Sequence, residues 1–236
     1  MPPAPGSSAP QTHSDEHNPA TATNISTAKI GKLRLHTRLL AQYGTGNTPL
    51  ESQLYLAGAS PEDMMDDKYV RSIGFVPYDW MGYGTGVNHF QQGGGLGLRG
   101  YAGYIAPEYD ADNNIFRSIA GNTGAAANAE LDLDGLVRFR PGKLAEYLHL
   151  DVYLFGDIGS MGYRQIGEKG KSKLQLAMPR ADAGAGAALT IKKFGPLQDI
   201  KPLTIRFDMP LVLSNLPAGE TDYFAFRFVV GVGRSF

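Results

Sequence analysis

The chain has 236 residues, of which 42% are hydrophobic and 19% charged, and its formal net charge is -1. This length allows one domain with a buried core, and the near-neutral balance provides no basic field for nucleic acid. The absence of cysteine excludes disulfides, thiolate nucleophiles and zinc–thiolate clusters. No apolar run reaches the roughly 18 residues of a membrane-spanning helix, but this does not exclude spanning strands, which alternate apolar and polar residues.

Residues 1–28 are rich in Pro, Ala, Ser, Thr and Asn and contain few large apolar side chains. Such a composition buries too little surface to offset the entropy of ordering, so we predict a disordered tail, followed by one domain over residues 29–236. The tail has neither the basic region nor the apolar region of a secretion signal. We expect any export signal to lie upstream of Met1.

A strand is predicted over residues 32–43, where apolar and polar residues alternate and only Leu40 breaks the pattern. It is longer than the usual strand of about 5–6 residues in soluble proteins. A second, short strand is predicted over residues 53–57, after a Gly-Asn-Thr-Pro turn. The apolar face of the first strand consists of Leu33, Leu35, Thr37, Leu39, Ala41 and Tyr43.

Residues 58–101 are predicted to form a long structured loop, because aromatic side chains are mixed with Gly, Pro and Asp up to residue 92. We expect Trp80 to pack this loop against the sheet, and a place at a membrane interface is the alternative. His89 has no partner at a metal-ligand spacing, which favours a structural role.

The loop ends in a glycine run, residues 93–101, with the sequence GGGLGLRGY. It contains the pattern G-x-G-x-x-G, which marks a dinucleotide site only between a strand and a helix. Gly103 and Pro107 follow it and prevent a helix from starting there. We therefore interpret the run as a glycine-rich turn that carries Arg99.

Alternation of apolar and polar residues returns repeatedly after the glycine run. Further strands are predicted over residues 127–134, 148–158, 174–192, 203–213 and 224–236. In the fourth of these, the residues expected to share one face are Leu203, Ile205, Phe207, Met209, Leu211 and Leu213.

Two interpretations of these strands remain open. A membrane barrel is favoured by the strand lengths, which match the roughly 9–11 residues needed to cross a bilayer at a tilt. A soluble barrel or sandwich that binds a small apolar ligand is the alternative, with the apolar faces turned inward. Aromatic residues at the predicted strand ends, as in the girdles of membrane barrels, are Tyr43, Tyr147, Tyr163, Tyr223, Phe224 and Phe236.

Catalytic motifs such as G-x-S-x-G and H-E-x-x-H are absent from the sequence. His149 and Asp151 share a polar face without a nucleophile beside them. Asp132 and Asp134 also share a face, which suits a cation or a charged lumen as well as acid catalysis. We predict no enzymatic activity, cofactor or metal, and the barrel part of an outer-membrane hydrolase is kept as an alternative.

The order of motifs resembles the C-terminal barrel half of the bacterial surface antigen family, which includes outer-membrane protein assembly factors and two-partner-secretion transporters. The glycine run is followed by NAELDLDG at 128–135, YLFGDIGSMG at 153–162, a Gly/Ala-rich strand, PLTIRFDMPL at 202–211 and a final FRFVVGVGRSF. The resemblance covers about residues 30–236. A complete family barrel has about 16 strands and follows periplasmic domains, so this chain corresponds to roughly the second half of a barrel.

The resemblance implies an all-β transmembrane antiparallel barrel, non-enzymatic, in the bacterial outer membrane. Its implied role is protein insertion or translocation, or anchoring of a fused upstream domain; its partners are lipid and substrate proteins or another barrel chain, and not nucleic acid. In the family, the arginine of the loop motif folds into the lumen and pairs with acids on later strands. The matching residues are Arg99, Gly100 and Tyr101 in the loop motif, Glu130 and Asp157 as the acids, and Phe228, Val230, Val232 and Phe236 as the C-terminal assembly signal.

Overall fold

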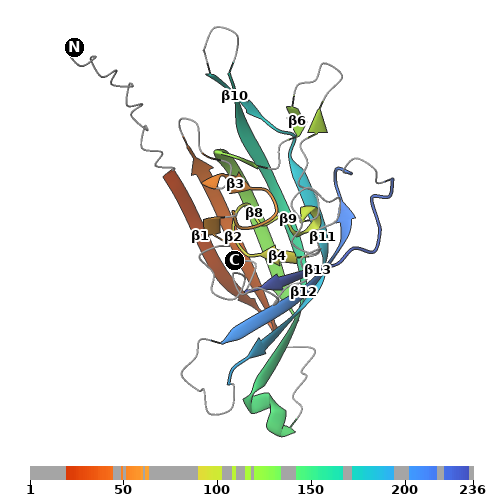
Figure 1. Ribbon diagram of the computed structural model, residues 1–236. Helices are drawn as coiled ribbons and strands as arrows, with labels where there is room; N and C mark the ends of the chain where they lie inside the picture. Colours follow the sequence, from red (N-terminus) through yellow and green to blue (C-terminus); the bar gives the residue numbers. More distant parts are fainter. Residues whose placement is uncertain are drawn as a thin grey trace, which may run out of the picture.

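The computed structural model describes residues 20–44, 49, 52–60, 62–63, 90–102, 108–109, 115–117, 120–133, 142–166, 172–193, 202–216 and 221–233. The described chain is mostly β-strand, as predicted (Figure 1). No described helix has the length and hydropathy needed to cross a membrane. The elements are β1 Ala20–Ile30, β2 Leu33–Tyr43, β3 Leu54–Tyr55, β4 Phe90–Gln92, the 3-10 helix η3 Arg99–Tyr101, β5 Glu108–Tyr109, β6 Ile115–Arg117, β7 Ala120–Gly121, β8 Thr123–Asp132, the 3-10 helix η4 Gly142–Glu146, β9 Leu148–Ile166, β10 Ser172–Leu176, β11 Arg180–Ile191, β12 Leu203–Leu213 and β13 Val229–Val232.

One nine-stranded sheet contains most of these strands, in the order β1-β2-β8-β9-β11-β12-β13-β4, with β10 paired to β9. Neighbours in it are antiparallel, except that β13 and β4 run parallel. The order is an open path: among the described strands no pairing joins β1 to β4. The described strands therefore form a large, mainly antiparallel sheet and not a closed barrel.

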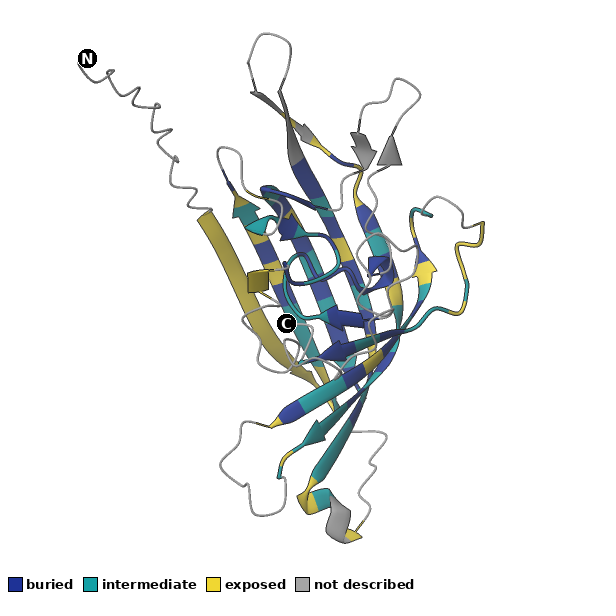
Figure 2. Cartoon of the chain, in the orientation of Figure 1, coloured by how far each residue is buried: buried dark blue, intermediate teal, exposed yellow. Residues whose placement is uncertain are grey.

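The two faces of the sheet differ in an unusual way. The inner face, defined here as the one covered by residues 54–60 and 90–102, buries charged and amide side chains such as Arg38 and Asn128. The outer face exposes apolar side chains, including Leu39, Leu154 and Ile158, which are 48–57% exposed. Figure 2 shows the resulting alternation of buried and exposed residues along the strands. The alternation read from the sequence thus separates the two faces, but the buried face is the polar one.

Leu40 breaks the alternation of β2 because it belongs to the inner face. It is 7% exposed and packs in the cluster formed with the loop segments. The neighbouring Leu39, on the outer face, is 57% exposed. The apolar exception in the polar face of β2 is therefore a contact with the covering loop.

The predicted disordered tail is wrong for residues 20–28, which lie in β1. β1 pairs along its whole length with β2, from Ala20 opposite Tyr43 to Ile30 opposite Leu33. Composition misled the prediction, because this strand is held by backbone pairing and by polar contacts such as Ser26 to Thr37 (2.7 Å between the hydroxyl oxygens). Figure 2 shows β1 exposed along its length, as expected for an edge strand. Residues 1–19 lie outside the described part.

The predicted common face of β12 is wrong for Leu213. Opposite β11, Val212 pairs with Ala183 and Pro210 with Gly184, so Leu211 is an extra residue in β12. Such a β-bulge reverses the side-chain alternation beyond it. Leu213 is consequently buried at 1% exposure against the loop, whereas Phe207, before the bulge, is 39% exposed.

The predicted strand over residues 224–236 is shorter in the structure. The strand β13 contains only residues 229–232, and Phe224 forms an isolated bridge with Val212. Two further backbone bonds continue the alignment with β12, from Leu213 N to Tyr223 O and from Ala225 N to Leu211 O. The C-terminal Phe236 lies outside the described residues.

Candidate functional site

The candidate site is the return of the loop across the inner face, residues 90–102. Residues 94–98 lie beside residues 54–59, with Leu96 N donating to Tyr55 O (2.9 Å) and Leu98 N to Leu56 O (3.1 Å). Gly95 is required here: its φ is +52°, and an added Cβ would clash with Gly58 O. The glycine run therefore permits two chain segments to approach each other on the inner face.

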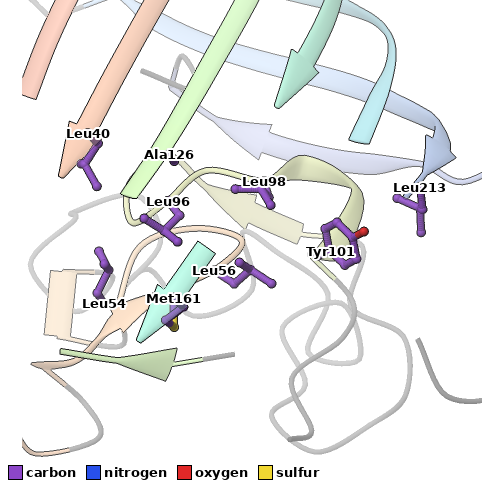
Figure 3. Packing of buried hydrophobic residues seen from close by; sticks show 9 residues of the cluster. All are labelled: Leu40, Leu54, Leu56, Leu96, Leu98, Tyr101, Ala126, Met161 and Leu213. Carbon is purple, nitrogen blue, oxygen red and sulfur yellow. The ribbon is translucent and has the colours of Figure 1, made fainter. Parts of the chain in front are cut away.

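An apolar cluster fixes this loop to the sheet (Figure 3). Leu96, Leu98 and Tyr101 of the loop are 0–1% exposed. They pack with residues from four strands and from the 54–56 segment, so the loop fills the inner side of the sheet. The remaining members of the cluster are Leu40, Leu54, Leu56, Ala126, Met161 and Leu213.

Beneath the loop, the strands present a row of polar side chains at one level of the sheet. Arg38 of β2 lies opposite Asn128 of β8, which lies opposite Asp157 of β9, which lies opposite Asp182 of β11. All four side chains are buried. The row follows the hydrogen-bonding direction of the sheet, and the loop crosses the strands along it.

Arg99 lies at the centre of this row and is 0% exposed. Its Nε donates to Asp157 Oδ2 (2.8 Å) and its Nη2 to Asp157 Oδ1 (2.9 Å), which is a bidentate pair. Its Nη1 donates to Glu130 Oε1 (2.6 Å). The structure therefore brings Arg99, Glu130 and Asp157 together, as the family resemblance implied.

Other groups also surround the Arg99 guanidinium. Its Cζ lies 3.9 Å from the centroid of the Phe155 ring, within cation–π range, and its Nη1 lies 3.9 Å from Asp208 Oδ1. Burial opposes the charged form, but Asp157, Glu130 and Asp208 outweigh it, so the pKa of Arg99 is raised above its ordinary value. Arg99 is thus a permanent cation held by carboxylates from three strands.

Gly100 and Tyr101 complete the loop motif on the β11–β12 side. A Cβ on Gly100 would clash with Leu213 Cδ2 and lie 2.7 Å from Asp182 Cβ, so only glycine fits without a shift. The Tyr101 hydroxyl donates to Asn215 O (3.1 Å). Burial raises the pKa of this hydroxyl, which keeps it neutral near pH 7. The three motif residues thus differ in their contacts: Arg99 pairs with acids, Gly100 lies close to β11 and β12, and the Tyr101 hydroxyl binds a backbone carbonyl.

Asn128 and Arg38 also hold the loop, although the sequence pattern alone did not assign them to the site. The Asn128 amide donates to Leu96 O (3.2 Å), Gly97 O (3.3 Å) and Asp157 Oδ1 (3.1 Å). Arg38 Nη2 donates to Gly95 O (2.6 Å). Both satisfy carbonyl groups of the loop that would otherwise be buried without a partner. One signal in the sequence could have indicated them. Asn128 lies two residues before Glu130 and Arg38 lies two residues before Leu40, so each pair shares one face of its strand.

Of the predicted assembly-signal residues, Phe228, Val230 and Val232 lie beside β12, and Phe236 lies outside the described residues. The Phe228 ring stacks on Phe207, with centroids 5.8 Å apart. Val230 is opposite Phe207 and Val232 is opposite Ile205. No described contact bears on their role as a signal, which stays a prediction.

The other polar residues considered in the sequence are dispersed. Asp132 accepts from Arg34 Nη2 (2.7 Å), and His149 Nε2 lies 2.9 Å from Asp151 Oδ1. Asp134, His89 and Trp80 lie outside the described residues. Within the described part, no group of three or more His, Cys, Asp or Glu side chains could hold a metal ion. The absence of catalysis and of a cofactor stays a prediction.

An open apolar groove of about 590 Å³ lies beside the outer-face residues of β1, β2, β8 and β9. Leu39 and Ile158 line it together with Ala41, Ala125 and Ala127. The small side chains leave room between the two larger ones. The groove is lined mainly by apolar residues, whereas the site around Arg99 is charged.

Comparison with protein-family models gives no match to this chain, and no curated protein matches it. The resemblance to the surface antigen family therefore depends on the ordered motifs alone. The contacts around Arg99, in contrast, are properties of this structure.

Proposed function

We propose that this chain is part of an outer-membrane β-barrel of the surface-antigen type, which acts without covalent chemistry in protein insertion or translocation. One observation carries the proposal: the sheet is apolar on its exposed face and charged on its buried face. Leu154 and Ile158 are about half exposed, whereas Asp157, which lies between them in the sequence of β9, is 2% exposed. A soluble sheet buries its apolar face, and a bilayer supplies the apolar surroundings that this outer face lacks.

The site around Arg99 supports a lumen that is occupied by the loop. The loop is held by one bidentate arginine pair, by Asn128 and by Arg38, and none of these contacts needs a substrate. Unpairing such a buried arginine is costly, so the loop stays inside by default. In this proposal the loop restricts passage through the barrel.

The exposed edge of β1 fits the same proposal. Open sheet edges are not stable in hydrocarbon, because their backbone groups find no partner there. In a membrane, β1 therefore requires a further strand, from another part of the protein or from a partner chain. Lipid and such a strand are the partners that the proposal includes.

A lysine scan of the outer face tests the proposal. In lipid vesicles, Ile158→Lys is expected to lower the free energy of unfolding by about 2–4 kcal/mol, as for a charge on the lipid face of a barrel. Met178→Lys is the matched control, since Met178 is exposed but lies between strands, and its expected cost is about 1 kcal/mol or less. Measurements of urea unfolding by tryptophan fluorescence give both values. If both substitutions change stability by less than about 0.5 kcal/mol, the outer face meets water and the proposal is wrong.

The apolar groove favours a second candidate, a soluble protein that binds a small apolar ligand. Its volume, about 590 Å³, lies within the usual range for ligand pockets. This candidate predicts that the purified chain is monomeric in buffer without detergent and binds a fluorescent fatty acid there. The membrane proposal predicts partition into the detergent phase instead.

A further inference from the structure

The terminal strand β13 has its outer edge covered by the loop itself. Val230, Gly231 and Val232 pair in parallel with Phe90, Gln91 and Gln92 of β4. On its other side, β13 pairs with residues 205–208 of β12 in antiparallel register. The strand β4 therefore pairs with the edge of β13 that faces away from β12, and β4 is the last strand of the sheet at this end.

One arginine crosses over β13 to hold β4. Arg206 of β12, Gly231 of β13 and Gln91 of β4 are in register across the three strands. Arg206 Nη2 donates to Gln91 Oε1 (2.6 Å), and Arg206 is 1% exposed. A Cβ on Gly231 would lie 2.5 Å from Arg206 Nε. The glycine thus leaves the space through which the guanidinium reaches the next strand.

The same arginine is linked to the Arg99 site. Arg206 Nη1 donates to Asp208 Oδ2. Asp208 Oδ1 accepts from the Tyr153 hydroxyl (2.6 Å) and lies 3.9 Å from Arg99 Nη1. Gln91 and Arg99, near the two ends of the returning loop, are therefore both linked to Asp208 of β12. Gln91 is linked through Arg206, and Arg99 lies beside the carboxylate itself.

We propose that β4 is a strap that closes the terminal edge of the sheet, and that the Arg206 bridge over Gly231 holds this strap in place. When the strap leaves, the N–H and C=O groups of β13 that paired with β4 lose their partners. This inference goes beyond the proposed function and does not depend on membrane insertion, because it concerns contacts within the chain.

Introduced cysteines test the strap, since the chain has none of its own. In the folded full chain, the pair Gln92→Cys with Val232→Cys is expected to form a disulfide under mild oxidation, because these residues are in register. The pair Ile205→Cys with Val232→Cys, across β12 and β13, is the control for folding. If the control pair forms and the first pair does not, β4 does not cover the edge and the proposal is overturned.

The bridge is tested by alkylation of the single thiol in the Val232→Cys variant. Gln91→Ala removes the acceptor of Arg206, and Gly231→Ala fills the space beneath it; each is expected to raise the alkylation rate about tenfold, in line with the loss of a hydrogen bond to a charged group. Ala188→Cys, at a position that is 2% exposed in β11, is the control and is expected to react at an unchanged rate. An unchanged rate for the thiol at position 232, or an equal rise at both positions, overturns the bridge.

Discussion

Arg99 is bound by three groups from the neighbouring strands β8 and β9, and each contacts a different part of the guanidinium. Asp157 of β9 accepts hydrogen bonds from Nε and Nη2, and Glu130 of β8 accepts one from Nη1. The Phe155 ring lies over the face of the guanidinium. Lysine could not replace it, because an ammonium has no planar fork. The motif arginine therefore positions the loop in one register along the polar row.

Removing this side chain gives the first prediction at the residue scale. Arg99→Ala is expected to lower the free energy of unfolding by about 3–5 kcal/mol, because Asp157 and Glu130 are left buried without their cation. Lys193→Ala is the matched control: its pair with Glu146 is similarly short, at 2.8 Å, but the two side chains are 36% and 64% exposed, so a much smaller loss is expected. Urea unfolding followed by fluorescence measures both. Equal losses in the two variants would contradict the account of the anchor.

The acids of this site could be predicted from the sequence, but the rest of the site could not. Glu130 and Asp157 lie on polar strand faces and match the family's motifs. Asn128 and Arg38 bind loop carbonyl groups, and these bonds depend on where the loop backbone crosses the sheet. Strand periodicity specifies a face but not the crossing path of a loop.

Among the elements, β2 shows how two adjacent leucines take opposite roles. Leu40 packs with the loop on the inner face, and Leu39 is exposed on the outer face. The break in alternation that Leu40 makes in the sequence thus marks the contact between strand and loop. The reversal at Leu213 has a different cause, the extra residue Leu211, which no periodicity argument reveals.

Truncating these leucines one at a time is the prediction at the element scale. Leu40→Ala is expected to cost about 2–5 kcal/mol, because it opens a cavity between β2 and the loop. Leu39→Ala is expected to cost at most about 1 kcal/mol, since no packed cluster surrounds it. Chemical unfolding of both variants under the same conditions gives the comparison. A larger loss for Leu39→Ala than for Leu40→Ala would show that the outer face is packed and the inner one is not.

The strands themselves were largely predictable, with β1 as the main exception. Alternation over residues 32–43 and 148–158 gave the faces of β2 and β9 because one side of each strand is apolar. The strand β1 has no such side: one face has Ala, Asn, Ser and a single Ile, the other has Thr, Lys and a single Ile, and the whole strand is exposed. Its existence depends on pairing with β2, which is tertiary information.

The described part of the molecule is a sheet that buries many charged side chains on its inner face and exposes apolar side chains on its outer face, with an open edge at β1 and with β4 paired to β13 at the other end. The buried polar row would be expensive in an ordinary protein core, but here the loop that crosses it supplies hydrogen-bond partners for Arg38, Asn128 and Asp157. In our proposal, lipid is the surrounding medium that makes both faces favourable at once.

Solvent accessibility at one outer position tests this claim most directly. Because the chain lacks cysteine, a spin label can be attached at Ile158→Cys alone, and at Glu146→Cys, exposed in η4, as the aqueous control. In vesicles, the label at 158 is expected to collide more with oxygen, which concentrates in lipid, than with a water-soluble nickel chelate, and the label at 146 is expected to show the reverse. Preferential collision with the nickel chelate at both positions would contradict the account.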